Sequence, residues 1–174
     1  GIIGAMGNNG IGVSGIAWKV KLMPCKFLDA SGGGALSDLE DCLDYAITKG
    51  ARVVNCSFES PVSSLTLSNA FLELRDAGII VVAAAGNSGT CAGTGDSVGY
   101  PGKYSSVIAV AATDSSDARA CFSSTGPAVA IAKTRSGAGP LILRLPVRTS
   151  RKPMRLPRLR PTLELRLEPL QRLD

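Results

Sequence analysis

The stretch VVAAAGNSG, residues 81–89, combines a buried strand with a polar exit. Its first residues are β-branched or small, which is typical of a strand covered on both faces. The run then passes through Ala85 and Gly86 into Asn87, whose primary amide needs hydrogen-bond partners. Ligands of parallel sheets bind beyond the carboxyl ends of the strands, so this amide can face a ligand. Gly-Asn pairs are also common in turns, and these residues alone leave Asn87 as either a ligand contact or a turn cap.

Further strand patterns alternate with amphipathic helices around this stretch. We expect strands at residues 20–28, 52–57, 79–85 and 105–112, the first of them an edge or irregular strand because it contains Pro24. One helix is predicted to open with a capping box of Ser37 and Glu40 and to end at Gly50, and a second spans residues 65–77. This alternation predicts an α/β fold with a mainly parallel sheet and helices on both faces, a three-layer αβα arrangement.

Charge divides the 174 residues into a body and a tail. Residues 1–132 have a net charge of −3, whereas residues 133–174 have a net charge of +8 and hold six of the ten prolines. The tail is predicted to be disordered low-complexity or out-of-frame sequence, with a basic arm for nucleic acid or anionic membrane and a solvated linker as alternatives. It has no aromatic residues to stack on bases, so no nucleic-acid partner is expected. No stretch reaches the roughly 18 apolar residues of a membrane span, and no signal peptide is recognisable.

The cysteines fall into two groups. Cys25 and Cys56 lie in apolar strand patterns and Cys42 lies on the inner face of a helix, so these three are predicted to be small buried hydrophobic residues. Cys91 and Cys121 lie in loop-like surroundings and are able to pair in an oxidising compartment, although spacing does not determine connectivity. The sequence has no CxxC motif and no histidine, which argues against a zinc site.

Several separate segments resemble one family, the subtilisin-like serine proteases. These segments are NNGIGVSGIA, KFLDASGGGALSDLEDCLDYAITKGARVVNCSF, AAAGNSG and VGYPGKYSSVIAVAATDSSDARACFSSTGP. The resemblance covers about residues 1–130. It implies a partial subtilisin-like peptidase domain over residues 1–132, truncated at both ends, whose complete form hydrolyses peptide bonds. It also implies a peptide or protein substrate, secretion and a monomeric state.

The resemblance gives roles to residues at the strand ends. Asn87 matches the asparagine that donates a hydrogen bond to the oxyanion of the tetrahedral intermediate. Ala84, Ala85 and Gly86 match one wall of the primary specificity pocket, and Gly99 matches its floor. The opposite wall is matched by Ser57–Ser60. In the opposite wall the family usually has a leucine and two glycines, and here Phe58 and Glu59 replace that pattern. The Glu59 carboxylate is expected to narrow the site, to favour basic side chains by charge pairing, or to point into solvent.

The loop GNNGIGV, residues 7–13, resembles a family loop that often binds calcium. The resemblance implies oxygen ligands from Asn9 and from the carbonyl groups of Ile11 and Val13. Family members take a carboxylate and a further ligand from an upstream segment that this chain does not have. We therefore expect a structural calcium ion at most, and no required cofactor.

The catalytic triad is not found in the sequence. There is no histidine, the HGTH motif of the family would end just before Gly1, and the aspartate lies further upstream. The family pattern stops near residue 132, before the GTSMA-like turn that carries the serine, and Ser136 has no such surroundings. We expect the chain alone to be inactive and poorly soluble. A non-catalytic peptide-binding module is the alternative, and a nucleotide site is disfavoured because GAMGNNGIG lacks the spacing of a phosphate loop.

Overall fold

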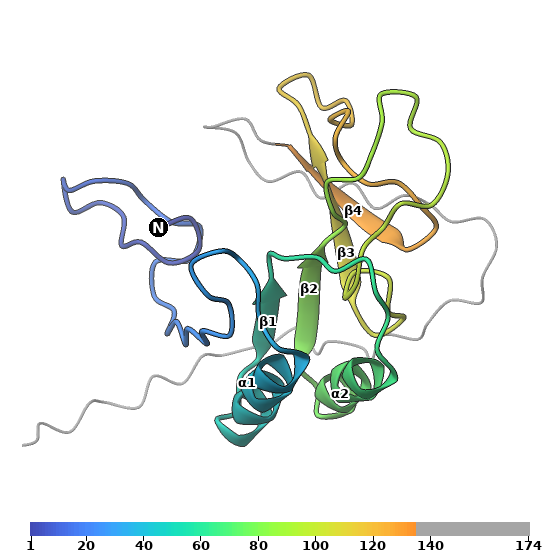
Figure 1. Ribbon diagram of the computed structural model, residues 1–174. Helices are drawn as coiled ribbons and strands as arrows, with labels where there is room; N and C mark the ends of the chain where they lie inside the picture. The colour runs from blue at the N-terminus through green and yellow to red at the C-terminus, as the bar shows by residue number, and fades with distance from the viewer. Residues whose placement is uncertain (135–174) are drawn as a thin grey trace, which may run out of the picture.

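The computed structural model describes residues 1–134 of the chain as a parallel sheet with two helices (Figure 1). In chain order the elements are α1 (Leu36–Thr48), β1 (Val53–Cys56), α2 (Leu65–Asp76), β2 (Ile80–Ala84), β3 (Ile108–Thr113) and β4 (Val129–Thr134). The strands lie in the order β1-β2-β3-β4, and each neighbouring pair is parallel. These findings confirm the predicted mainly parallel α/β fold. The predicted boundary at residue 132 falls inside β4, and the rest of the predicted tail, with Ser136, lies outside the described residues.

Both helices pack against the same face of the sheet. Val81 and Ala83 of β2 are buried in one cluster with apolar residues of the two helices, which are Leu39, Leu43, Ala46, Leu67, Phe71 and Leu74. Ala83 pairs with Ala109 of β3, so the covered face continues across the sheet. Ile80 points to the other face and is 52% exposed. The second helical layer that we predicted is therefore not among the elements of residues 1–134.

The two helix starts differ from one another in their capping. Helix α1 begins at Leu36, its N-cap is Ala35, and no side chain caps it, so the predicted capping box is wrong. Because the N-cap lies two residues earlier than predicted, Ser37 is already helical, and its hydroxyl contacts Asp38 instead. In α2 the N-cap is Ser64, whose side chain accepts a hydrogen bond from the Leu67 N–H at 3.3 Å.

Four of the five cysteines form disulfides. Cys91 pairs with Cys121, as one of our alternatives proposed, whereas Cys25 pairs with Cys42. The prediction of buried thiols is therefore wrong for Cys25 and Cys42. It is confirmed for Cys56, which is 2% exposed and whose burial raises the pKa of its thiol to about 12. The predicted strand over residues 20–28 is also wrong, because this segment has no strand neighbour in the described structure and Pro24 has no N–H to donate.

An open sheet edge is expected to make the chain aggregate at high concentration, while it stays monomeric at low concentration. No strand among residues 1–134 pairs with the outer edge of β1, and Val53 on that strand is 59% exposed. A lysine at such an edge hinders pairing with a second chain. We expect Val53→Lys to lower the aggregated fraction measured by light scattering several-fold. The matched change Val62→Lys, at a loop position that is 69% exposed, should leave it nearly unchanged, and equal effects of both would contradict edge pairing.

Candidate functional site

The segments after β1 and β2 meet at the carboxyl edge of the sheet. Ser60 and Tyr100 exchange two backbone hydrogen bonds, of 2.8 and 2.9 Å, as an isolated antiparallel bridge. The Gly99 N–H donates to the Ala85 carbonyl at 3.0 Å. These bonds hold side by side the three segments that the resemblance assigned to two walls and a floor, namely Ser57–Ser60, Ala84–Gly86 and Gly99.

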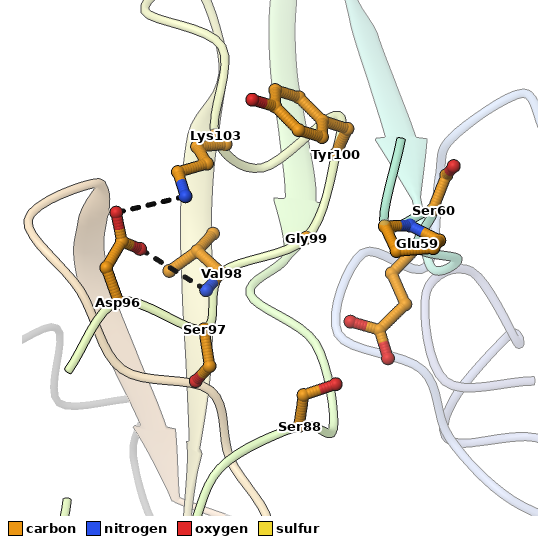
Figure 2. Close-up of a pocket in the computed structure, with 10 residues that line it drawn as sticks. Glu59, Ser60, Ser88, Asp96, Ser97, Val98, Gly99, Tyr100 and Lys103 are labelled. Atoms are coloured by element: carbon orange, nitrogen blue, oxygen red, sulfur yellow. Dashed lines mark hydrogen bonds and ion pairs between the residues drawn. The ribbon is translucent and has the colours of Figure 1, made fainter. Parts of the chain in front are cut away.

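A pocket of about 430 Å³ lies beside this junction (Figure 2). Of the residues that the sequence singled out, Glu59 and Gly99 line it directly. Its further lining residues are Ser60, Pro61, Ser88, Asp96, Ser97, Val98, Tyr100 and Lys103. Asp96 and Lys103 form an ion pair of 3.0 Å across one side of the pocket. Sequence reasoning missed this pair, although both charges flank the VGYPG segment that it had singled out.

The Glu59 carboxylate occupies the gap between the Gly86 wall and the Gly99 floor. A Cβ atom at Gly86 would overlap Glu59 Oε2, and a Cβ at Gly99 would lie 2.9 Å from the same oxygen. Glu59 Oε1 accepts a hydrogen bond of 3.0 Å from the Asn87 backbone N–H. The Glu59 side chain is exposed, as one of our alternatives expected. Two glycines leave room for its carboxylate, and a backbone N–H donates to it. The other two alternatives, a narrowed site and charge pairing with a basic side chain, stay predictions.

Asn87 presents its side-chain amide at the exit of β2 without a partner among residues 1–134, and the residue is exposed. A turn-capping asparagine would accept a hydrogen bond from a nearby backbone N–H. Here other groups hold the loop. The Ser88 N–H donates to the hydroxyl of the buried Ser124 at 3.1 Å, and the Gly89 N–H donates to the Phe122 carbonyl at 2.9 Å. The Asn87 amide is therefore free to donate to a bound molecule.

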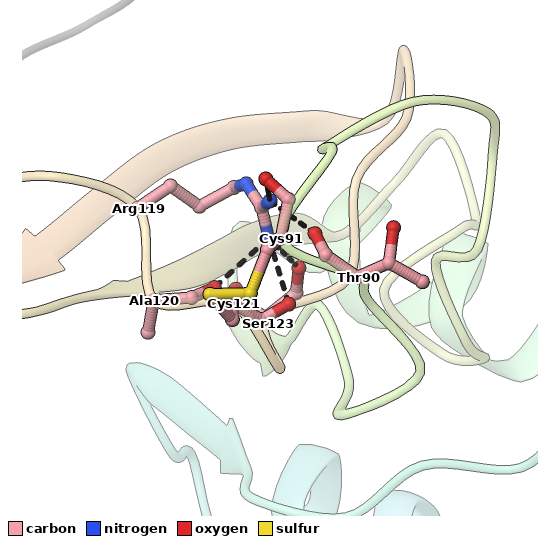
Figure 3. The surroundings of a disulfide bond; sticks show 6 residues. All are labelled: Thr90, Cys91, Arg119, Ala120, Cys121 and Ser123. Atoms are coloured by element: carbon pink, nitrogen blue, oxygen red, sulfur yellow. Dashed lines mark hydrogen bonds between the residues drawn. A yellow bond between two sulfur atoms is a disulfide. The ribbon is translucent and has the colours of Figure 1, made fainter.

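Arg119 and the Cys91–Cys121 disulfide hold the loop that follows Asn87 (Figure 3). The Arg119 guanidinium donates to carbonyl oxygens of two segments, which belong to Thr90, Cys91, Ala120, Cys121 and Ser123. The bonds to Ala120 and Ser123 measure 2.9 and 2.7 Å. No local sequence signal indicated this role, because the partner carbonyls come from two segments about 30 residues apart.

Two residues of the predicted opposite wall direct their side chains elsewhere. The Ser57 hydroxyl accepts a hydrogen bond of 2.9 Å from the Asn55 side-chain amide. The Phe58 ring packs edge-on against Phe27, with ring centroids 4.9 Å apart, and it adjoins the main core. The Phe58 side chain is therefore a packing residue and does not line the pocket.

The loop over residues 7–13 offers oxygen atoms but no carboxylate. Asn9 Oδ1 accepts a hydrogen bond of 3.1 Å from the Ile11 N–H, and Val13 is 69% exposed. Among the described residues no group of three or more His, Cys, Asp or Glu side chains is arranged to hold a metal ion. The calcium ligands Asn9, Ile11 and Val13 stay a prediction.

The fold agrees with what the chain is similar to. The family model described as "Subtilase family" matches residues 1–139. The chain belongs to the subtilase family. It is 44% identical to Subtilisin DY of Bacillus licheniformis over 126 residues, which are 72% of this chain and 45% of that protein. It is 41% identical to Subtilisin E of Bacillus subtilis (strain 168) over 144 residues, which are 79% of this chain and 37% of that protein.

This subtilase also matches solved structures. The crystal structure of the psychrophilic subtilisin-like protease Apa1 from the Antarctic psychrotroph Pseudoalteromonas sp. AS-11 superposes with a TM-score of 0.54 at 35% identity. The match covers 62% of this chain and 24% of Apa1. The chain spans less than half the length of the two curated subtilisins that it matches. Its α/β architecture is thus subtilisin-like over the part that it shares with them.

Proposed function

We propose that this chain supplies the oxyanion donor and the substrate pocket of a subtilisin-type serine endopeptidase. The observation that carries the proposal is the exposed, unpartnered Asn87 amide at the carboxyl end of β2, next to a pocket of about 430 Å³. Attack on a peptide carbonyl places negative charge on its oxygen, and a rigidly held amide donor stabilises that charge. The bonds from the Ser88 and Gly89 N–H groups to Ser124 and Phe122 hold the backbone directly after Asn87.

The chain's own residues support binding and polarisation of the carbonyl rather than the complete reaction. The 174 residues include no histidine, so they hold no imidazole to accept the proton of a serine nucleophile. We therefore expect no enzymatic hydrolysis of casein by the chain alone. Hydrolysis at an ordinary protease's rate, blocked by a serine-directed phosphonate, would contradict this part of the proposal.

Asn87→Ala tests the oxyanion donor directly. The ligand is acetyl-Ala-Ala-Pro-Ala with a free carboxylate, because a product carboxylate oxygen resembles the oxyanion. We expect the substitution to raise the Kd in isothermal titration about tenfold or more, since a hydrogen bond to a charged acceptor is lost. Asn69→Ala, at an exposed position on α2, is the matched control and should leave the Kd unchanged. Equal affinities of Asn87→Ala and the parent chain would remove the basis of the proposal.

Secretion and a monomeric state are also part of the proposal. The Cys25–Cys42 and Cys91–Cys121 disulfides support an oxidising compartment, where such bonds persist. Among residues 1–134, neither helix has the length and apolar character needed to cross a membrane. Size-exclusion chromatography of the secreted protein, with thiol labelling before and after reduction, tests both points.

A further inference from the structure

The pocket has one charge that is not balanced. Its charged lining residues are Glu59, Asp96 and Lys103. Asp96 and Lys103 neutralise one another as an ion pair of 3.0 Å, whereas Glu59 has no ion-pair partner within the part of the chain that the structure describes. Figure 2 shows Glu59 across the pocket from that pair. The pocket therefore has a net charge of about −1 when these groups are ionised.

The unbalanced carboxylate stands where a substrate side chain has to enter. It fills the gap between Gly86 and Gly99, which are the wall and floor assigned to the substrate side chain. An apolar side chain in this gap would have to cover or displace the carboxylate, and removing an unpaired carboxylate from water is costly. A guanidinium or ammonium group instead pairs with it, and a guanidinium is able to form two parallel hydrogen bonds.

The Glu59 carboxylate would also repel the oxyanion of the tetrahedral intermediate. Glu59 Oε1 accepts a hydrogen bond of 3.0 Å from the Asn87 backbone N–H. The carboxylate charge therefore lies close to Asn87, the residue that would stabilise the negative charge of the oxyanion. Like charges repel, and the repulsion grows as they come closer. A basic substrate side chain paired with Glu59 would cancel this repulsion, whereas an apolar side chain would not.

We propose that Glu59 makes this pocket selective for substrates with a basic residue, arginine above lysine, immediately before the scissile bond. The inference rests on the proposed function, since that function assigns the gap to the substrate. It adds a substrate class that a glycine at this position would not select.

The test uses the full chain and the peptide amides acetyl-Ala-Ala-Pro-X-NH₂, with X as arginine, lysine, leucine or glutamate. We expect the arginine peptide to bind about tenfold or more tightly than the leucine peptide, as a charge-assisted pair allows. Glu59→Gln should remove most of this preference, and added salt should weaken it in the parent chain. Glu73→Gln, the same change at an exposed position on α2, is the control and should keep the preference.

Benzamidine separates this inference from the proposed function, because it carries an amidinium group without a peptide backbone. Equal binding of the arginine and leucine peptides, with no effect of Glu59→Gln, would overturn the role of Glu59 and leave the proposed function intact. If benzamidine binds in a way that depends on Glu59 and none of the peptides binds, the charged pocket is supported and the proposed function is contradicted. If neither probe binds, both are wrong.

Discussion

Replacing Arg119 with alanine should lower the free energy of unfolding by about 3 kcal/mol, because one charged group donates to carbonyls of two different segments. The Nη1 group contacts the Ala120, Cys121 and Ser123 carbonyls, and the Nη2 group reaches across to Thr90 and Cys91. Water is able to replace the more exposed of these bonds, so the expected loss is well below the sum of five bonds. Urea unfolding at a concentration where the chain stays monomeric measures it.

The expected loss also has a local signature. The Ser88 and Gly89 N–H groups are hydrogen-bonded to the segment that Arg119 holds, so their hydrogen exchange should become faster in Arg119→Ala. Arg119→Lys should recover less than half of the stability, since an ammonium group does not reproduce the planar fork of a guanidinium. Arg75→Ala removes an arginine from an exposed ion pair and is the control, with an expected change below about 0.5 kcal/mol. A loss at Arg119 as small as at Arg75 would show that the disulfide alone holds the loop.

Sequence patterns predicted the parts of the molecule that depend on local periodicity. The apolar run before Asn87 became β2, and the stretches around residues 52–57 and 65–77 became β1 and α2 within one or two residues at each end. Helix ends were predictable where glycine adopts positive φ, as Gly50 does at +67° and Gly78 at +78°. In the site, the parallel topology was enough to bring the ends of β1 and β2 together.

The errors have a common origin in contacts that are distant in the sequence. The pattern of residues 20–28 reads as a strand, but a strand forms only where a neighbour pairs with it. The bond from Cys25 to Cys42 joins residues whose apolar surroundings gave no indication of pairing. Phe58 was assigned to the pocket wall from its place in a motif, whereas its ring packs against Phe27. Strand β4 was not predicted at all, because we had attributed its last residues to the tail.

Phe71→Ala should have the largest effect, lowering the free energy of unfolding by about 4 kcal/mol. The Phe71 side chain is 0% exposed at the centre of the core between α2 and the sheet, so its removal loses buried apolar area and leaves a cavity. Leu65→Ala removes an apolar side chain from the same helix at a position that is 78% exposed, and it should change the free energy of unfolding by less than about 0.5 kcal/mol. A loss below about 2 kcal/mol at Phe71 would mean that the core is not packed as described, because well-packed aromatic residues cost more than this to truncate.

The effect of Phe71→Ala should extend to the pocket. The Phe71 ring lies 5.8 Å from the Tyr104 ring, and the Tyr104 ring lies 4.8 Å from that of Tyr100, which lines the pocket. The Tyr104 hydroxyl also bonds to the backbone of Ser64, the N-cap of α2. Loss of Phe71 therefore loosens the ring contacts of Tyr104 and its hydroxyl bonds to Ser64, which together support the segment that includes Gly99. In the fraction that stays folded, we expect weaker peptide binding than in Leu65→Ala, and unchanged affinity would show that the core and the pocket are energetically independent.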